Sequence, residues 1–283
     1  MTPSLAVHRS RKLVPEFVLH RPQTVTDACE LLYRYKGSAA VLAGGIDVIS
    51  RMKFGVGPVH MVAITGIAEM RSIRRHDDCL QIGAAATHRE LETDALLQST
   101  MPALADYIGG LGNIRVRCQG TIGGNLMADE AGYEILPLLL VLDAVLNFCD
   151  VAKAASYTVS ARNFVRRGEA AQPVDLLTSI SIPLPPAKLV WNRDLRPTLA
   201  LVAGVRDGNG SPAAVAAALV GAHRRAAWGP VSLGARLDAT TAAARWAAAL
   251  PHPDLLRAPG PIYARRVGAV MLRRALTDSG LAA

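Results

Sequence analysis

The sequence has 283 residues, a formal net charge of +8, and 51% hydrophobic but only 5% aromatic residues. This length allows one large domain or two modest ones, and the hydrophobic fraction excludes an intrinsically disordered chain. The most apolar run, 135–148, contains Asp143 and is too short to cross the ~30 Å hydrocarbon core of a bilayer, so we expect no membrane span. Residues 1–15 are basic and lack an apolar stretch, which predicts an N-terminal tail, no secretory signal and a cytoplasmic location.

The distribution of basic residues and cysteines excludes further classes. The basic residues are scattered without interleaved aromatic residues, so we expect no nucleic-acid partner; such a surface suits an anionic cofactor or an acidic partner subunit. The four cysteines are irregularly spaced and form no CxxC pair: Cys29, Cys79, Cys118 and Cys149. This spacing argues against a zinc site or an iron–sulfur cluster within this chain, and we expect buried free thiols.

The hydrophobic pattern predicts short elements from the N-terminus onward. In chain order these are a strand over 16–22, a helix capped by Thr24 or Thr26 that ends near Gly37, a strand over 39–42, a helical turn over 47–52, and strands over 60–64 and 79–82. Thr87 and Glu90 have the spacing of a capping box, which predicts the start of a helix over 90–97. A helix over 101–109 follows.

The second half begins with a glycine-rich stretch over 110–124. A helix over 135–143 and strands over 145–149 and 178–182 follow, and then a cluster of prolines at 183, 185 and 186, where we place a domain boundary. Beyond it, strands over 199–206 and 214–220 form a hairpin around 207–210, and helices over 240–250 and 262–276 end the chain. The alternation predicts an α+β or α/β fold in two pieces.

Two glycine loops carry the chemical information. The first follows the strand over 39–42 and reads Leu42-Ala43-Gly44-Gly45-Ile46-Asp47; the second reads Thr121-Ile122-Gly123-Gly124-Asn125. Paired glycines permit positive φ and let backbone N–H groups converge on phosphate oxygens. Neither loop has the Walker A or the GxGxxG pattern. Together the loops predict a ligand that contains a pyrophosphate, gripped from two sides.

The same loops resemble the two flavin-binding segments of the FAD-binding medium subunits of molybdenum hydroxylases, the carbon monoxide dehydrogenase and xanthine dehydrogenase type. The similarity covers 43–53 and, more closely, 117–126, and supporting segments at 82–91, 138–144, 175–178, 263–266 and 272–276 occur in the family's order. The resemblance implies an α+β fold in which a PCMH-type FAD-binding domain over 16–185, with subdomains of about 16–70 and 71–185, precedes a C-terminal flavoprotein domain over 186–283.

The resemblance also implies roles for single residues. Segments 42–47 and 121–125 would hold the FAD pyrophosphate through backbone amides, and Ile122 would approach the isoalloxazine. Leu177 would pack near that ring, Glu134 lies near the expected contact to the adenosine, and Arg193 lies near a position where relatives carry a lysine at the flavin. Two of these positions depart from the family pattern: Ile46 replaces a polar residue, and Gly132-Tyr133-Glu134 replaces a common Ser-Asp.

The implied function is electron transfer in a complex. A large subunit with a molybdenum cofactor hydroxylates the substrate, a small subunit passes electrons through iron–sulfur clusters, and FAD in this chain delivers them to an external acceptor. The partners would make a heterotrimer or a dimer of heterotrimers, with no metal and no covalent catalyst in this chain. Two alternatives remain open: a stand-alone PCMH-type flavin oxidoreductase, and a non-redox scaffold in which the loops are ordinary turns.

Overall fold

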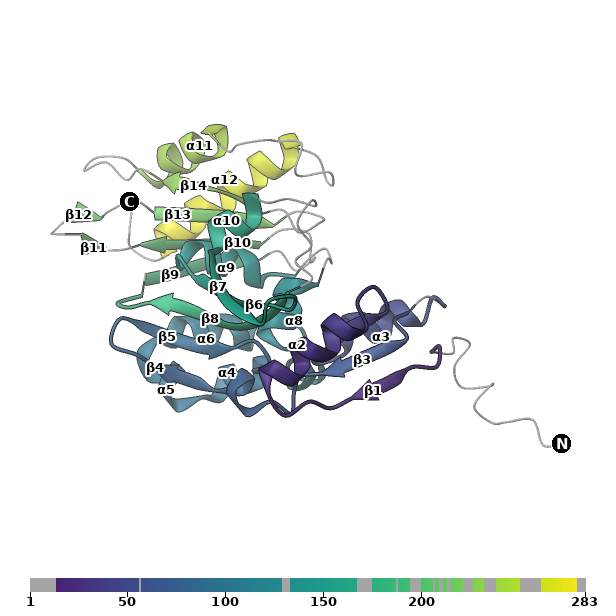
Figure 1. The fold of residues 1–283 in the computed structure, drawn as a ribbon. Helices are drawn as coiled ribbons and strands as arrows, with labels where there is room; N and C mark the ends of the chain where they lie inside the picture. The colour runs from purple at the N-terminus through teal and green to yellow at the C-terminus, as the bar shows by residue number, and fades with distance from the viewer. Residues whose placement is uncertain are drawn as a thin grey trace.

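The computed structural model describes residues 14–55, 57–128, 133–166, 175–186, 188–193, 200–205, 207–208, 211–212, 215–220, 226–231, 238–249 and 261–278. These residues form three principal sheets with helices packed between and around them (Figure 1). The predicted mixture of helices and strands is therefore confirmed.

The first sheet is parallel and has the strand order β1-β3-β2. Its strands are β1 (Val18–His20), β2 (Ala39–Leu42) and β3 (His60–Ala63), joined by helices α2 (Val25–Arg34) and α3 (Ile46–Met52). Parallel neighbours need such crossover helices. Thr24 is the N-cap of α2, because its side chain accepts a hydrogen bond from the Asp27 N–H. Strand β2 lies at an edge of the sheet, so its end is open to the loop that follows.

The second sheet has five antiparallel strands in the order β4-β5-β8-β6-β7. They are β4 (Ile73–Arg75), β5 (Cys79–Gly83), β8 (Leu176–Pro183), β6 (Val145–Asp150) and β7 (Ala155–Ser160), and the short helix η1 (Ala68–Arg71) precedes β4. The pattern did not predict β4 or β7, whose residues are mostly exposed and carry few apolar side chains.

Short helices surround this sheet. They are α4 (His88–Thr93), α5 (Ala95–Thr100), α6 (Pro102–Gly109), α7 (Ile114–Gln119), α8 (Ile122–Met127), α9 (Ile135–Val141) and α10 (Ala161–Arg166). The capping box of Thr87 and Glu90 is confirmed. The single helix expected over 90–97 is wrong, because Asp94 leaves the helical conformation and caps a second helix through the Leu97 N–H. The glycine-rich stretch over 110–124 contains α7 and the start of α8, neither of which was predicted.

The third sheet is antiparallel, with the order β14-β13-β10-β9. Its strands are β9 (Lys188–Arg193), β10 (Ala200–Val205), β13 (Val215–Val220) and β14 (Ala226–Val231), and the two-residue strands β11 (Asp207–Gly208) and β12 (Ser211–Pro212) pair between β10 and β13. The predicted hairpin of β10 and β13 is confirmed. Helices α11 (Ala239–Ala249) and α12 (Pro261–Asp278) pack against each other and against this sheet.

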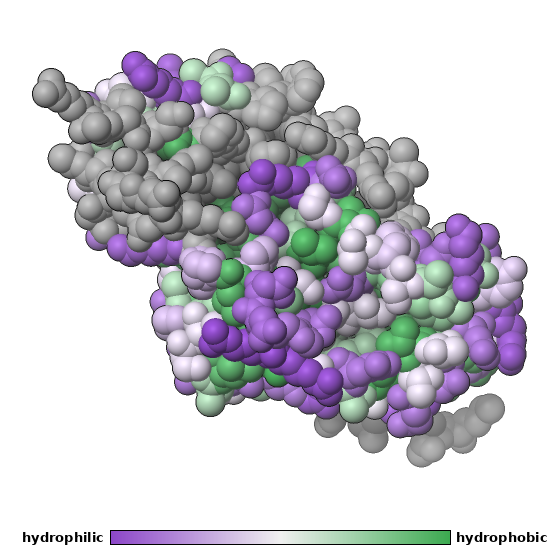
Figure 2. All heavy atoms as spheres, turned by 60° about the vertical axis from the view of Figure 1, so that its left-hand side comes forward, coloured by the Kyte–Doolittle hydropathy of each residue, from purple (hydrophilic) through white to green (hydrophobic). Residues whose placement is uncertain are grey.

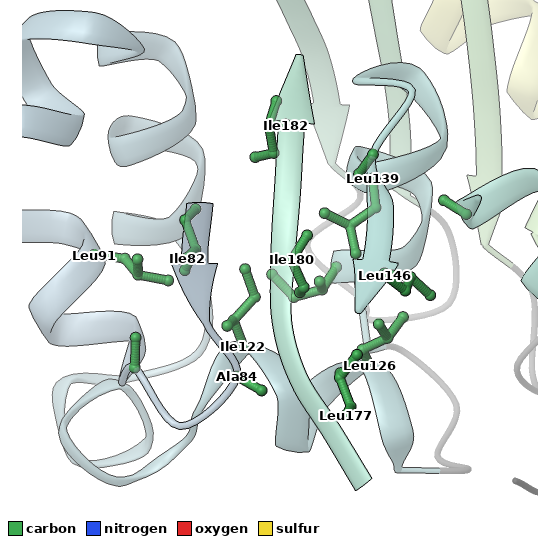
Figure 3. Close-up of a cluster of buried hydrophobic side chains, with 14 of the residues drawn as sticks. Ile82, Ala84, Leu91, Ile122, Leu126, Leu139, Leu146, Leu177, Ile180 and Ile182 are labelled. Atoms are coloured by element: carbon green, nitrogen blue, oxygen red, sulfur yellow. The ribbon is translucent and has the colours of Figure 1, made fainter. Parts of the chain in front are cut away.

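One hydrophobic core joins the three sheets. It extends from Ala28 and Val62 in the N-terminal part, through the five-stranded sheet, to Leu189 and Val202 in the third sheet. Figure 3 shows its centre, where side chains of β5, β8 and α9 meet. Every residue of α9 is buried, and this helix contacts α8, α10 and strands β10, β13 and β14. The prolines at which we place a boundary lie at the end of β8 and just before β9, and this core continues across them.

The described surface is mixed in polarity. On the face shown in Figure 2, hydrophobic residues form small patches between hydrophilic ones. Large apolar side chains are exposed in and next to the N-terminal sheet, at Phe17, Val18, Leu19 and Val59. In the described part of the chain, none of the helices combines the length and the apolar character that a bilayer crossing requires.

The four cysteines differ in exposure. Cys29 and Cys149 are buried as expected, whereas Cys79 is partly exposed and Cys118, on α7, is exposed; for these two the expectation of a buried thiol is wrong. Burial, together with the hydrogen bond and charge of Cys149, raises the pKa of the Cys29 thiol to about 12. Thiolates and not thiols react with alkylating reagents, so this shift suppresses the reactivity of Cys29.

We expect iodoacetamide at pH 8 to modify one cysteine rapidly in the native protein, namely Cys118. Cys29 should react more than about a hundredfold more slowly, because it is both enclosed and protonated. Mass spectrometry of the alkylated protein measures each rate, and Cys118→Ser should remove the fast phase. Rapid modification of Cys29 under native conditions would contradict the packing of α2 against β6.

Candidate flavin site

The two glycine loops line one cavity of about 850 Å³. This volume lies in the upper part of the ~300–1,000 Å³ range of ligand sites. The first loop reaches it because it links the edge strand β2 to α3. The second reaches it because Thr121 follows α7 as the N-cap of α8, and residues 122–125 form the first turn of that helix. Residues 175–177, at the start of β8, complete the wall. The predicted convergence of the two loops is thus confirmed.

The loops are in direct contact at Gly44. A Cβ placed on Gly44 would lie 1.7 Å from the carbonyl oxygen of Gln119, so only glycine fits here. The following residue, Gly45, has a φ of +74°, a conformation that glycine adopts without strain. Glycine is therefore required at these two positions for different reasons: Gly44 permits the close approach of the Gln119 carbonyl, and Gly45 permits the turn into α3.

The first loop offers unpaired backbone donors. In the described part of the chain, the N–H groups of residues 44–48 have no hydrogen-bond partner, while the carbonyl of Gly45 accepts from Ile49. Successive free N–H groups around a glycine with positive φ form a concave site that suits a phosphate group. Ala43, Gly44, Gly45, Ile46 and Asp47 all line the cavity, whereas Leu42 is not among the lining residues.

The second loop differs from the expectation that its amides face the pyrophosphate. The N–H groups of Ile122 and Gly123 donate to the carbonyls of Ala86 and Ala84, at 3.0 and 2.9 Å. The Gly124 N–H donates to the Thr121 hydroxyl, which caps α8, and the Asn125 N–H donates to the Thr121 carbonyl. The first two bonds hold the loop against the connection between β5 and α4, and the last two are internal to the loop. Its surface toward the cavity consists of Thr121, Gly123, Gly124 and Asn125.

Four further predicted residues have distinct places. Leu177 lines the cavity and is also buried in the core. The side chain of Ile122 is fully buried and points into that core (Figure 3), not toward the cavity as expected. Glu134 precedes α9 and accepts hydrogen bonds from the Tyr107 hydroxyl; it is not among the lining residues. Arg193 ends β9, and its side chain lies outside the described residues.

Several lining residues were missed by the sequence reasoning. Lys36 and Arg51 place cationic side chains at the cavity, and Arg51 pairs with Asp47 one turn earlier on α3. Tyr133, Asp175 and His88 also line it. The sequence gives little indication that these residues line a ligand site, because each is a common residue type that lies outside a recognisable motif. In the described residues, no three His, Cys, Asp or Glu side chains gather closely enough to hold a metal ion.

His88 links α4 to the second loop and is buried. It follows the N-cap Thr87, and its own N–H donates to the Gly120 carbonyl at 2.8 Å, so it links α4 to the second loop. Its side chain is only 2% exposed. Burial, and secondly the positive charge of Arg117, lower its pKa to about 4. The imidazole is therefore neutral at physiological pH.

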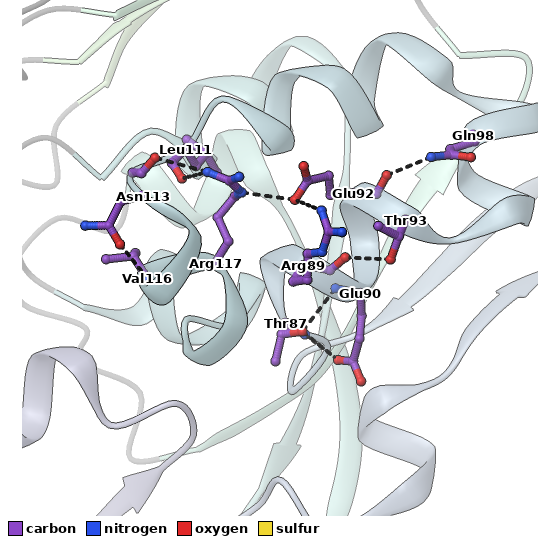
Figure 4. Close-up of polar contacts among 11 residues, drawn as sticks. Thr87, Arg89, Glu90, Glu92, Thr93, Gln98, Leu111, Asn113, Val116 and Arg117 are labelled. Carbon is purple, nitrogen blue, oxygen red and sulfur yellow. Dashed lines mark hydrogen bonds and ion pairs between the residues drawn. The ribbon is translucent and has the colours of Figure 1, made fainter.

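Arg117 organises the polar contacts behind the second loop (Figure 4). Its Nε donates to Glu92 on α4 at 3.0 Å, and its Nη1 donates to the Gly112 carbonyl at 3.1 Å. Arg89 contacts the same Glu92 carboxylate but is much more exposed than Arg117. Burial alone would raise the pKa of Glu92, but the hydrogen bonds and charges of the two arginines lower it.

We expect Arg117→Met to lower the unfolding free energy by about 2–3 kcal/mol, because a charge-assisted hydrogen bond and carbonyl contacts are lost together. It should also raise the pKa of His88, since a nearby positive charge is removed. Denaturant unfolding measures the first effect and imidazole titration by NMR the second. Arg89→Met is the matched control and should cost less than about 1 kcal/mol, as exposed ion pairs usually do. Equal costs for both variants would contradict the role of Arg117.

The size and lining of the cavity are compatible with a bound flavin dinucleotide. It combines free amides around Gly45, which suit a phosphate group, with an apolar wall that includes Ala84, Leu176 and Leu177. Among the charged lining residues, Arg51 is paired with Asp47, and Lys36 adds a further cation. Gly44 and Gly123 allow the loops to pack so closely that a Cβ at either position would overlap neighbouring backbone.

Comparison with known proteins agrees with this geometry. The family model described as "FAD binding domain in molybdopterin dehydrogenase" matches residues 15–185. The caffeine dehydrogenase subunit beta of Pseudomonas sp. (strain CBB1) is 25% identical over 174 residues, and the carbon monoxide dehydrogenase medium chain of Afipia carboxidovorans is 31% identical over 173. Each alignment covers 60% of this chain and 59% of the relative, so the chain spans about three-fifths of the length of these curated relatives.

The fold is similar to solved structures over nearly the whole chain. A reconstituted CO dehydrogenase from Oligotropha carboxidovorans matches with a TM-score of 0.82 and 26% identity, covering 96% of this chain and 100% of the other. A chain of quinoline 2-oxidoreductase from Pseudomonas putida 86 has the same TM-score at 22% identity, covering 95% and 98%, and shows similarity of fold alone. The predicted family resemblance and fold class are confirmed. Through residues 15–185, the chain belongs to the family of FAD-binding domains of molybdopterin dehydrogenases.

Proposed function

We propose that this chain is the FAD-binding, electron-transfer subunit of a multi-subunit molybdenum hydroxylase. The observation that carries the proposal is the convergence of two glycine loops, distant in sequence, on one cavity with free amides. Family membership and the names of the relatives, which are subunits of dehydrogenases, support it. When bound, FAD supplies the redox chemistry, exchanging electrons between a partner's iron–sulfur clusters and an external acceptor.

The residues of this chain bind and orient the cofactor. We propose that the amides of residues 44–48 bind the diphosphate, with Lys36 and Arg51 adding positive charge nearby. Asn125 adds a side-chain contact, and Leu177 packs against the bound cofactor. Ile46 lines the cavity with a hydrocarbon side chain, so its contribution to phosphate binding is through its N–H group.

We also propose the organisation and partners of the protein. The N-terminal parallel sheet and the five-stranded sheet correspond to subdomains of about 16–70 and 71–185, and the third sheet to a C-terminal domain over 186–283. The partners are a small iron–sulfur subunit and a large subunit with the molybdenum cofactor, in a heterotrimer or its dimer, located in the cytoplasm. The basic surface suits an acidic partner subunit.

Cofactor analysis of the native complex tests the proposal. The full chain should purify with the visible absorption of oxidised flavin, and denaturation should release FAD. Iron and molybdenum should co-purify in other subunits, and substrate should reduce the flavin only when those subunits are present. A full-length, folded chain that binds no FAD would overturn the proposal. Turnover of a substrate by the flavin-loaded chain alone would favour a stand-alone oxidoreductase instead.

A further inference from the structure

His88 has a side chain that the protein itself does not satisfy. Its Nδ1 is enclosed and has no hydrogen-bond partner in the described part of the chain. The residue is only 2% exposed, so water does not reach this atom either. A buried polar atom without a partner typically costs about 1–3 kcal/mol. Native proteins contain few such groups. Because Nδ1 is enclosed, Nε2 is the ring nitrogen available to a ligand.

The other edge of the ring lies next to Gly120, a residue that lines the cavity. Cδ2, which neighbours Nε2 in the imidazole, is the side-chain atom that a Cβ on Gly120 would approach, at 3.1 Å. Gly120 and His88 both line the cavity, at the place where Ile46 of the first loop meets the second loop. Cδ2 thus adjoins a residue that lines the cavity, whereas Nδ1 is enclosed, and these two contacts put the Cδ2–Nε2 edge nearer the cavity than Nδ1.

The enclosure of Nδ1 also selects the tautomer. A neutral imidazole carries one N–H donor and one acceptor nitrogen. Buried N–H donors without a partner are rarer than unpaired acceptors, so the proton is better placed on Nε2 than on the enclosed Nδ1. The ring then presents an uncharged N–H donor to the cavity, and its neutrality avoids a buried unpaired charge.

We propose that His88 is a cofactor-binding residue, whose Nε2–H donates a hydrogen bond to an acceptor atom of the bound dinucleotide. This inference rests on the proposed function, since it requires FAD in this cavity. His88 is attached to the second loop through its backbone N–H and to the cavity through its ring. It therefore supplies the donor that the amides of the second loop, which are paired within the protein, do not supply.

Three variants of the full-length, FAD-free chain test the proposal by titration with FAD. His88→Leu removes the donor while keeping an apolar side chain of similar size, and we expect about tenfold weaker FAD binding. His88→Gln keeps a neutral N–H donor and should stay within about threefold of the wild type. His76→Leu is the matched control, because His76 is exposed in the turn between β4 and β5, and it should not change FAD affinity.

Thermal unfolding without FAD separates cofactor binding from a structural role. Because His88→Leu removes an unsatisfied buried group, the FAD-free melting temperature should stay the same or rise, while the stabilisation by added FAD falls. A lower FAD-free melting temperature with unchanged FAD affinity would overturn the inference. A wild-type chain that binds no FAD would instead overturn the proposed function.

A second titration identifies the acceptor. ADP carries the diphosphate but lacks the flavin ring. If His88→Leu weakens ADP and FAD by the same factor, the acceptor is in the ADP moiety; if it weakens only FAD, the acceptor is in the flavin moiety. Both results support the hydrogen bond, whereas an unchanged affinity for both ligands contradicts it.

Discussion

Gly44→Ala is expected to abolish FAD binding. The new Cβ would lie 1.7 Å from the Gln119 carbonyl oxygen and 2.5 Å from its carbon, both backbone atoms that no rotamer change can move. The two loops must separate to admit the methyl group, which breaks the contact that closes the cavity. We expect more than a hundredfold loss of FAD affinity and a loss of about 3 kcal/mol or more in unfolding free energy, the upper range for overpacking.

Alanine substitutions at two other glycines should have smaller effects than Gly44→Ala, and they serve as controls. At Gly66 the nearest atoms to a new Cβ are 4.0 Å away, so Gly66→Ala should leave FAD affinity and stability near the wild type. Gly45→Ala meets only side chains at 3.4 Å but requires a positive φ, and it should cost about 1 kcal/mol. FAD titration and denaturant unfolding of the three variants measure this order. Equal FAD affinity for Gly44→Ala and Gly66→Ala would show that the loops do not meet.

The second large effect is a loss of stability in mild acid. The pKa of His88 is lowered from its ordinary value near 6.5 to about 4 in the folded protein. Between these values the unfolded chain binds a proton that the folded chain does not bind, so stability decreases as the pH falls from 6.5 to 4. At ~1.4 kcal/mol per pKa unit, the complete loss is about 3 kcal/mol. Urea unfolding of the FAD-free chain at several pH values measures this decrease.

His88→Gln should flatten the stability profile in this window, because glutamine does not titrate. His76→Gln should keep the wild-type slope. Glu90 affects stability at lower pH than His88 does. Burial alone would raise the pKa of Glu90, but hydrogen bonds from Thr87 and Arg71 and the charge of Arg71 lower it. Its stabilisation is lost as the pH falls below the ordinary carboxyl value. An unchanged slope in His88→Gln would show that His88 titrates normally.

Much of the fold could be predicted because local signals agree with tertiary packing. Strand β2 matches the expected residues, and the capping box at Thr87 starts α4 as predicted. The short helices α7 and α8 could not be predicted from propensity. Helix α8 contains Gly123 and Gly124, and α7 has only six residues, of which Ile114 and Val116 are β-branched; both residue types disfavour helices. They form because Asn113 and Thr121 cap their first turns and because the second loop is tied to the connection between β5 and α4.

The candidate site was only partly predictable for a similar reason. The two glycine loops are recognisable in the sequence by their paired glycines, and in the structure both line one cavity. Which amides remain free depends on contacts formed elsewhere in the chain: those of the second loop are paired with Ala84, Ala86 and Thr121. The importance of His88 depends on its enclosure beside α7, which a histidine at a helix start does not reveal.

Helix α9 limits how this protein can be divided. All its residues are buried, and it contacts the loop-bearing helix α8 as well as β10, β13 and β14. A chain ending at residue 185 would expose a row of leucines to water and invite aggregation. Residues 15–185, which match the flavin-domain family, are therefore not expected to fold well alone. A gene fusion or domain transplant should include the C-terminal sheet, because that sheet covers α9.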